Sequence, residues 1–181
     1  MYFHLRLSLF AAVLVAAIAA VAADPLRAAY QASVSTGKDP VIGTWILNLA
    51  KSTYRPGPAP KSQTRTYEEQ LGGAETSPVV IAGVKTTIKT VYADGHSTSI
   101  QYSANYDSVE YPVTGSPDSD MIALKRTDAY TAAATLTHAG KEIGTARRVI
   151  SEDGKTMTIT YDGMWEGQSA HNVAVFDKQE K

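Results

Sequence analysis

From Val41 onward the chain alternates apolar and polar residues in short runs, and Gly, Pro, Asn and Asp separate one run from the next. No stretch carries the apolar stripe with a 3.6-residue period that marks a long amphipathic helix. Alternation with period two is typical of strands that bury one face, and the runs are rich in β-branched and aromatic residues. We predict strands at about 41–49, 62–70, 79–92 (interrupted at 82–83), after the turn at 94–95, and at about 107–111, 120–127, 130–138, 142–151, 155–162 and 170–177.

The turns between these strands are short, which predicts a meander of antiparallel neighbours. Asp94-Gly95 and Asp153-Gly154 favour the left-handed backbone of two-residue hairpin turns. A meander leaves two exposed edges unless its first and last strands pair. We therefore expect an all-β fold in which an antiparallel up-and-down meander of about 8–10 strands closes into a barrel. A sandwich of two sheets is the alternative, because strand number and turn spacing alone do not separate the two.

Prolines interrupt the pattern after the first predicted strand. Pro56, Pro58 and Pro60 follow one another at alternate positions. Proline lacks the N–H donor that a sheet ladder needs, and its ring restricts the backbone. We predict that the segment from Tyr54 to Pro60 is a stiff extended connector, a loop or lid that borders one rim of the barrel.

The N-terminus has the three parts of a secretory signal. A short segment with Arg6 precedes an uncharged apolar stretch from Leu7 to Val21, and small residues follow. Cleavage after Ala22 or after Ala23 satisfies the small-x-small rule. We predict a periplasmic or secreted protein without a membrane span after cleavage, divided into a signal peptide at 1–23, a flexible leader at 24–40 and a single barrel domain at 41–178.

The composition of the 181-residue chain argues against several classes of function. Its 17 basic and 18 acidic residues give a net charge of −1, without the basic excess that nucleic-acid binding uses. It has no Cys, which excludes thiolate catalysis, disulfides and Cys-ligated metals. The sequence has no Gly-rich phosphate loop and no Gly-x-Ser-x-Gly nucleophile motif. We expect no nucleic acid, no cofactor and no metal, since metal-ligand spacing is not found at His96, His138 or His171.

Gly43-Thr44-Trp45 opens the first predicted strand and is similar to the Gly-x-Trp opening of the calycins, the superfamily of the lipocalins and fatty-acid-binding proteins. In that superfamily the Trp plugs one end of an antiparallel barrel. In lipocalins a basic residue from late in the barrel packs against this Trp, and the nearest late basic residue here is Lys178. The resemblance implies a lipocalin-like barrel. The Pro-rich connector departs from the fatty-acid-binding proteins, which insert two short helices after the first strand.

Longer stretches resemble a family of uncharacterised exported bacterial proteins. The similarity covers most of residues 40–178, and that family lends no known activity. The stretches that carry it lie at 43–52, 56–62, 111–117 and 151–158.

The candidate ligand-binding residues follow from the barrel and from the resemblance. Trp45 closes one end, and Tyr102 and Tyr161 lie on alternating runs whose aromatic residues line either a cavity or an ordinary core. Fatty-acid-binding proteins hold a ligand carboxylate with an inward Arg and a Tyr on late strands, which implies this role for Arg147 or Arg148 together with Tyr161. Adjacent residues on a strand face opposite sides. Arg147 points inward if Ile143 does, and Arg148 if the opposite face is buried.

These features favour a binding protein that holds a small apolar or amphipathic molecule in the barrel. The first alternative is a filled barrel or sandwich that acts through its surface as a structural or protein-interaction domain of the cell envelope. The second is an enzyme that uses His and carboxylates on the open rim, although the sequence assigns no catalytic residue. A cavity inside the barrel distinguishes the binding protein from the filled domain.

Overall fold

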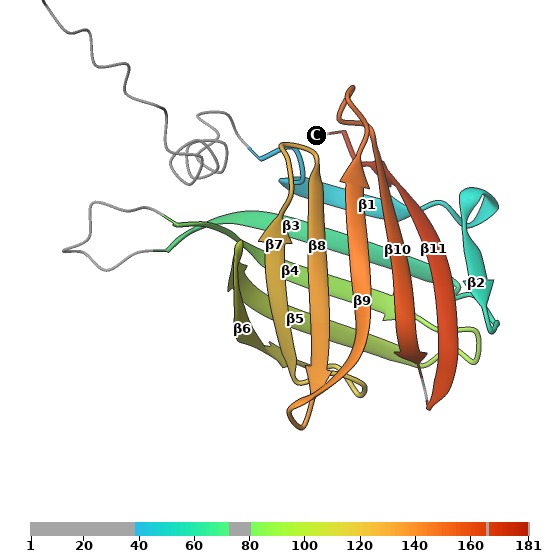
Figure 1. Cartoon of the computed structure of the whole chain (residues 1–181). Helices are drawn as coiled ribbons and strands as arrows, with labels where there is room; N and C mark the ends of the chain where they lie inside the picture. The colour runs from blue at the N-terminus through green and yellow to red at the C-terminus, as the bar shows by residue number, and fades with distance from the viewer. Residues whose placement is uncertain (1–38, 73–80, 166, 181) are drawn as a thin grey trace, which may run out of the picture.

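The computed structural model of the chain describes residues 39–72, 81–165 and 167–180 (Figure 1). The predicted signal peptide and residues 24–38 of the predicted leader lie outside the described residues. No helix within the described ranges is long and apolar enough to cross a membrane.

The described chain consists of strands and one short 3-10 helix, η1, at Leu49–Lys51. The strands are β1 (Gly43–Leu47), β2 (Thr53–Arg55), β3 (Ser62–Gly72), β4 (Ile81–Val91), β5 (Ser97–Asn105), β6 (Asp107–Thr114), β7 (Met121–Arg126), β8 (Thr131–His138), β9 (Lys141–Ile150), β10 (Thr156–Trp165) and β11 (Gln168–Lys178).

Ten of these strands form a closed antiparallel barrel. From β3 to β11 each strand pairs with the next along the chain, and β1 pairs with both β3 and β11. Trp45 lies opposite Arg65 on β3 and opposite Lys178 on β11. The predicted up-and-down barrel is therefore confirmed, and the sandwich alternative is wrong.

The first predicted strand ends early, at Leu47. A second short strand, β2, follows after η1 and includes the first two residues of the predicted connector, Tyr54 and Arg55. Asn48 caps η1 by accepting a hydrogen bond from the Lys51 backbone N–H at 3.2 Å. The chain then resumes as β2, which pairs with residues 171–173 of β11, beyond the part of β11 that pairs with β1. Among the described residues β2 pairs with β11 alone, so the barrel wall has a gap between β2 and β3. The prolines cross this gap, and the ladder resumes where the Lys61 N–H donates to the Val91 carbonyl at 2.8 Å.

The predicted interruption of the strand at 82–83 is wrong, because β4 runs unbroken through Gly83. A Cβ atom at Gly83 would lie 2.5 Å from the Ala104 carbonyl oxygen. This glycine allows a close approach of β4 to β5 and does not end the strand. Both Asp-Gly turns have the expected left-handed glycine, with φ of +98° at Gly95 and +68° at Gly154. The prediction of two-residue turns is wrong, because the closing backbone hydrogen bonds join Tyr92 to His96 and Ser151 to Thr156, across three and four residues.

Large side chains fill one end of the barrel. Trp45, Met157 and Phe176 are fully buried there. The Trp45 indole N–H donates to the Val41 carbonyl at 2.7 Å. The Lys178 ammonium lies 4.9 Å from the centre of the Trp45 ring and donates to the Pro40 carbonyl at 2.9 Å. We call this the closed end.

A buried ion pair anchors the start of the described chain to the closed end. Asp39 pairs with Arg126 of β7, and the two side chains are 14% and 8% exposed. The Tyr106 hydroxyl donates to Asp39 Oδ2 at 3.0 Å, and the Arg126 guanidinium lies 4.3 Å from the Tyr106 ring centre. The contacts of the barrel therefore extend to Asp39, two residues before the boundary predicted at Val41.

Replacing Asp39 by Asn should lower the free energy of unfolding by about 3 kcal/mol, because the buried Arg126 guanidinium loses its anion. The matched change Glu68→Gln removes the exposed partner of Lys85 and should cost less than about 1 kcal/mol. Urea unfolding followed by tryptophan fluorescence measures both losses. Equal losses would contradict the anchoring role of Asp39.

Candidate functional site

A cavity of about 180 Å³ lies inside the barrel beyond the closed end. Small side chains create it: Ala132 and Ala134 on β8, Ala146 on β9 and Ala174 on β11 face the same space. The remaining apolar wall consists of Ile88, Ile100, Val113, Ile122, Leu124, Leu136, Ile143 and Ile159. Because most of its lining surface is apolar, the cavity suits the apolar part of a ligand.

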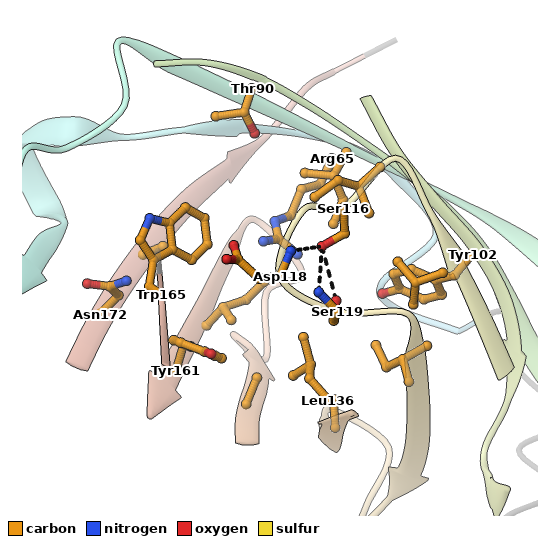
Figure 2. A pocket seen from close by; sticks show the side chains of 18 of the residues that line it. Arg65, Thr90, Tyr102, Ser116, Asp118, Ser119, Leu136, Tyr161, Trp165 and Asn172 are labelled. Carbon is orange, nitrogen blue, oxygen red and sulfur yellow. Dashed lines mark hydrogen bonds between the residues drawn. The ribbon is translucent and has the colours of Figure 1, made fainter. Parts of the chain in front are cut away.

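The loop between β6 and β7 covers part of the cavity (Figure 2). The Ser116 hydroxyl oxygen accepts hydrogen bonds from the backbone N–H groups of Asp118 and Ser119, at 3.3 and 3.1 Å. Gly115 has φ of +76°, and a Cβ atom there would lie 2.1 Å from the Ser99 carbonyl oxygen. Hydrogen bonds and a required glycine thus hold the loop over the cavity.

Two guanidinium groups bring positive charge to this apolar space. Arg148 of β9 donates from Nη2 to the Tyr106 hydroxyl at 2.7 Å, and its Nε is buried without a hydrogen-bond partner. Arg65 of β3 donates from Nε to Gln63 Oε1 at 2.9 Å, and its guanidinium carbon lies 5.3 Å from the Phe176 ring centre. Within the described ranges neither Arg65 nor Arg148 forms an ion pair.

Two of the predicted residues, Tyr102 and Tyr161, line the cavity. Burial raises the pKa of Tyr102, and the neighbouring Tyr67 raises it further, against the opposing effect of the two arginines. Burial also raises the pKa of Tyr161, and the negative charge of the Asp118 carboxylate raises it further. The Tyr161 hydroxyl donates to the Met164 carbonyl at 2.6 Å. Both tyrosines therefore present neutral hydroxyl groups at neutral pH.

Trp45 lies at the closed end and does not line the cavity. Its position agrees with the expectation that it closes one end of the barrel.

Of the two arginines between which the sequence left the inward position open, Arg148 points inward and the candidate Arg147 does not line the cavity. Arg147 is exposed on the outer face of β9, and Arg148 takes the inward position left open as the alternative. The cause is a β-bulge, since Leu136 pairs with Gly144 while Thr137 pairs with Glu142. Ile143 is the extra residue in the bulge and lines the cavity. The alternation then restarts one residue later, so Ile143 does not predict the face of Arg147.

Arg65 and the loop from Ser116 to Ser119 were not anticipated from the sequence. Along β3 the inward residues Gln63, Arg65 and Tyr67 alternate with polar threonines, so neither face of the strand is marked as apolar. The alternation that predicts a strand does not tell which of its faces turns inward when both are polar. A loop that folds over a cavity has no periodic signal at all.

The histidines contribute no metal site in the part of the chain that is described, where no group of three His, Cys, Asp or Glu side chains could hold a metal ion. His96 hydrogen-bonds through Nδ1 to Asp94 at 2.6 Å, and His171 does so to Asp162 at 2.5 Å. Both pairs are more than half exposed. They make solvent-exposed contacts and lie apart from the two arginines.

Comparison with protein-family models, with curated proteins and with solved structures finds no match to this chain.

The raised pKa of Tyr102 predicts a loss of stability in alkali. In the unfolded chain a tyrosine ionises near pH 10, whereas in the folded protein burial keeps Tyr102 protonated to higher pH. From about pH 10 to 12 the unfolded state therefore binds fewer protons, and stability falls by up to about 1.4 kcal/mol per pH unit for this residue.

Tyr102→Phe should remove this contribution to the slope, measured by urea unfolding at a series of alkaline pH values. Tyr130→Phe, at an exposed tyrosine, is the matched control and should leave the slope unchanged. An unchanged slope in Tyr102→Phe would show that the Tyr102 hydroxyl is not held neutral by burial.

Proposed function

We propose that this protein is an exported binding protein that holds a small amphipathic anion in a lipocalin-like barrel. The charged group of the ligand lies between Arg65 and Arg148, and its apolar part lies along the alanine and isoleucine wall. The observation that carries the proposal is the presence of these two guanidinium groups in one apolar cavity, with no ion pair to either among the described residues.

Electrostatics supports an anion. A guanidinium stays protonated in proteins, so the cavity carries its charge whether or not a ligand is bound. Burial of a charge without an ion partner is costly, and a carboxylate offsets that cost with charge-assisted, often bidentate, hydrogen bonds. The partnerless Nε of Arg148 supplies one donor for such a bond. The neutral hydroxyl of Tyr102 supplies a second donor close to the same groups.

The volume supports a small ligand. A cavity of about 150 Å³ lined by apolar residues holds benzene in another protein. The cavity of about 180 Å³ in this barrel is of the same order. A short chain or a single ring therefore fits inside, and a longer ligand would extend through the opening.

The closed end and the N-terminus support the lipocalin-like and exported parts of the proposal. Lys178 packs over Trp45, as the resemblance to lipocalins implies for a late basic residue. The predicted signal at 1–23, with small residues at its end, supports export to the periplasm or the medium.

Octanoate should bind to the mature protein, and Arg148→Met should weaken this binding by roughly 10- to 100-fold, since a hydrogen bond to a charged group contributes about 1.5–3 kcal/mol. Arg147→Met is the matched control. The Arg147 side chain lies next to Arg148 in the sequence but on the outer face of β9, so this change should alter the affinity by less than about twofold. Isothermal titration calorimetry measures both, with circular dichroism to establish folding.

Arg65→Met provides a second test at a position away from the Tyr106 contact. If Arg148→Met and Arg65→Met both bound octanoate as tightly as the Arg147→Met control and the unsubstituted protein, the proposed anion site would be contradicted. Absence of octanoate binding to the unsubstituted protein would favour the filled, surface-acting barrel.

Expression with the full N-terminus should yield a periplasmic or secreted protein. Its intact mass should equal that of a chain that begins at Ala23 or Asp24. Native mass spectrometry of that fraction should also show an additional mass that is lost on denaturation, from a co-purified ligand. A chain that keeps residues 1–22 and stays in the cytosolic fraction would contradict export.

A further inference from the structure

The Pro-rich segment and the turn between β4 and β5 enclose a second hollow outside the cavity. This outer compartment has a volume of about 200 Å³. The cavity and the outer compartment adjoin, because both are lined by Tyr54, Gln63, Thr90, Tyr92, Trp165 and Asn172. Figure 2 shows Trp165 and Asn172 on one side of the cavity, across from Ser119 and Tyr102.

One wall of the outer compartment is aromatic. The rings of Tyr92 and His96 are stacked, with their centres 4.2 Å apart and an angle of 11° between their planes. Trp165 lies next to them, with its ring centre 6.3 Å from that of Tyr92 and a tilt of 41°. Tyr161 meets Trp165 edge-on at 6.5 Å. Trp165 is only partly buried, in contrast to the fully buried Trp45, so part of its ring is open to a ligand.

Hydrogen bonds hold this aromatic wall in place. Asp94 Oδ1 accepts from the His96 backbone N–H at 3.0 Å and lies 2.6 Å from Nδ1 of the same residue. The Tyr92 N–H donates to the His96 carbonyl at 2.9 Å, which closes the turn. The Tyr92 and His96 rings are therefore stacked before any ligand arrives, which lowers the entropy lost on binding.

The wall contributed by the Pro-rich segment is rigid as well. Pro56, Pro58 and Pro60 line it, and each pyrrolidine ring has restricted torsions. A hollow between rigid rings and aromatic faces suits a flat, rigid group better than a flexible chain, because a chain loses rotamer freedom when it is confined. Aromatic faces also gain an additional attraction from a stacked ring.

The distance from the outer compartment to the Arg65 guanidinium fits a ligand that has an anionic group and a separate ring. Gln63 lines both spaces, and Arg65 is the next inward residue along β3, about 7 Å further into the barrel. A short linker therefore suffices between a carboxylate at Arg65 and a ring in the outer compartment. The cavity alone has room for little more than the carboxylate and this linker or one small ring.

We propose that the outer compartment is a second subsite, which binds a planar aromatic ring joined by a short chain to the anionic group held in the cavity. This inference rests on the proposed function and assigns the ligand class as aryl-substituted short-chain carboxylates. Trp165 and Tyr92 provide the stacking surface, and the prolines contribute another part of the wall.

Calorimetric titration of the mature protein with naphthylbutanoate and octanoate tests the subsite. Both probes carry one carboxylate, and naphthylbutanoate should bind roughly tenfold more tightly because its ring stacks in the outer compartment. Trp165→Leu keeps an apolar side chain in the wall that the two spaces share, and it should abolish the preference for naphthylbutanoate, measured as the ratio of the two affinities in the same variant. Trp165→Phe, which keeps an aromatic face, should retain most of the advantage.

The two tryptophans of the chain give an independent readout by nuclear magnetic resonance. Naphthylbutanoate should shift the indole N–H signal of Trp165 strongly through the ring current of the stacked naphthyl group, and octanoate, which has no ring, should shift it much less although Trp165 also lines the cavity. The Trp45 signal serves as the internal control, because this indole is buried at the closed end and donates to Val41. The Trp165→Leu spectrum assigns the two signals.

The failure of this inference differs from the failure of the proposed function. Arg148-dependent binding of both probes with equal affinity, and no shift at Trp165, would overturn the aromatic subsite and leave the anion site in place. No binding of either probe would overturn both. Tighter, Trp165-dependent binding of naphthylbutanoate supports the subsite.

Discussion

The pairing of β1 with both β3 and β11 is the interaction on which the rest of the structure depends. It closes the meander, and closure gives every strand an inner and an outer face. The inner faces then converge on one space, which brings Arg65 from early in the chain to the same cavity as Arg148 from a late strand. The same short strand carries Trp45, which fills the closed end and confines the empty space to the rest of the barrel.

The arginines at the two ends of the barrel differ in whether they form an ion pair. At the closed end Asp39 neutralises Arg126, and the Tyr106 hydroxyl connects this pair to Arg148 by accepting from the arginine and donating to the carboxylate. Towards the cavity, Arg148 and Arg65 have no ion partner among the described residues. Alanines keep this space empty, so the interior combines two guanidinium groups, against the single carboxylate of Asp118 among the described lining residues, with apolar room beside them.

Most of the fold was predictable because alternation and turn chemistry are local signals. The closed barrel, the Asp-Gly turns and the burial of Trp45 all follow from short stretches of sequence. The site was predictable only in part. Tyr102 and Tyr161 do line the cavity, but the bulge at Ile143 shifts the register before Arg147, and a bulge depends on the partner strand. The inward position of Arg65 could not be predicted, because polar residues occupy both faces of β3.

The gap between β2 and β3 has a consequence for how copies of this protein meet one another. A break in a barrel wall exposes strand edges, whose free N–H and C=O groups can recruit a strand from another molecule and start aggregation. The segment that crosses this break carries Pro56, Pro58 and Pro60, which have no N–H to donate. The prolines thus leave the wall open at the outer compartment and offer an incoming strand no regular ladder of N–H donors, which disfavours self-association at this edge.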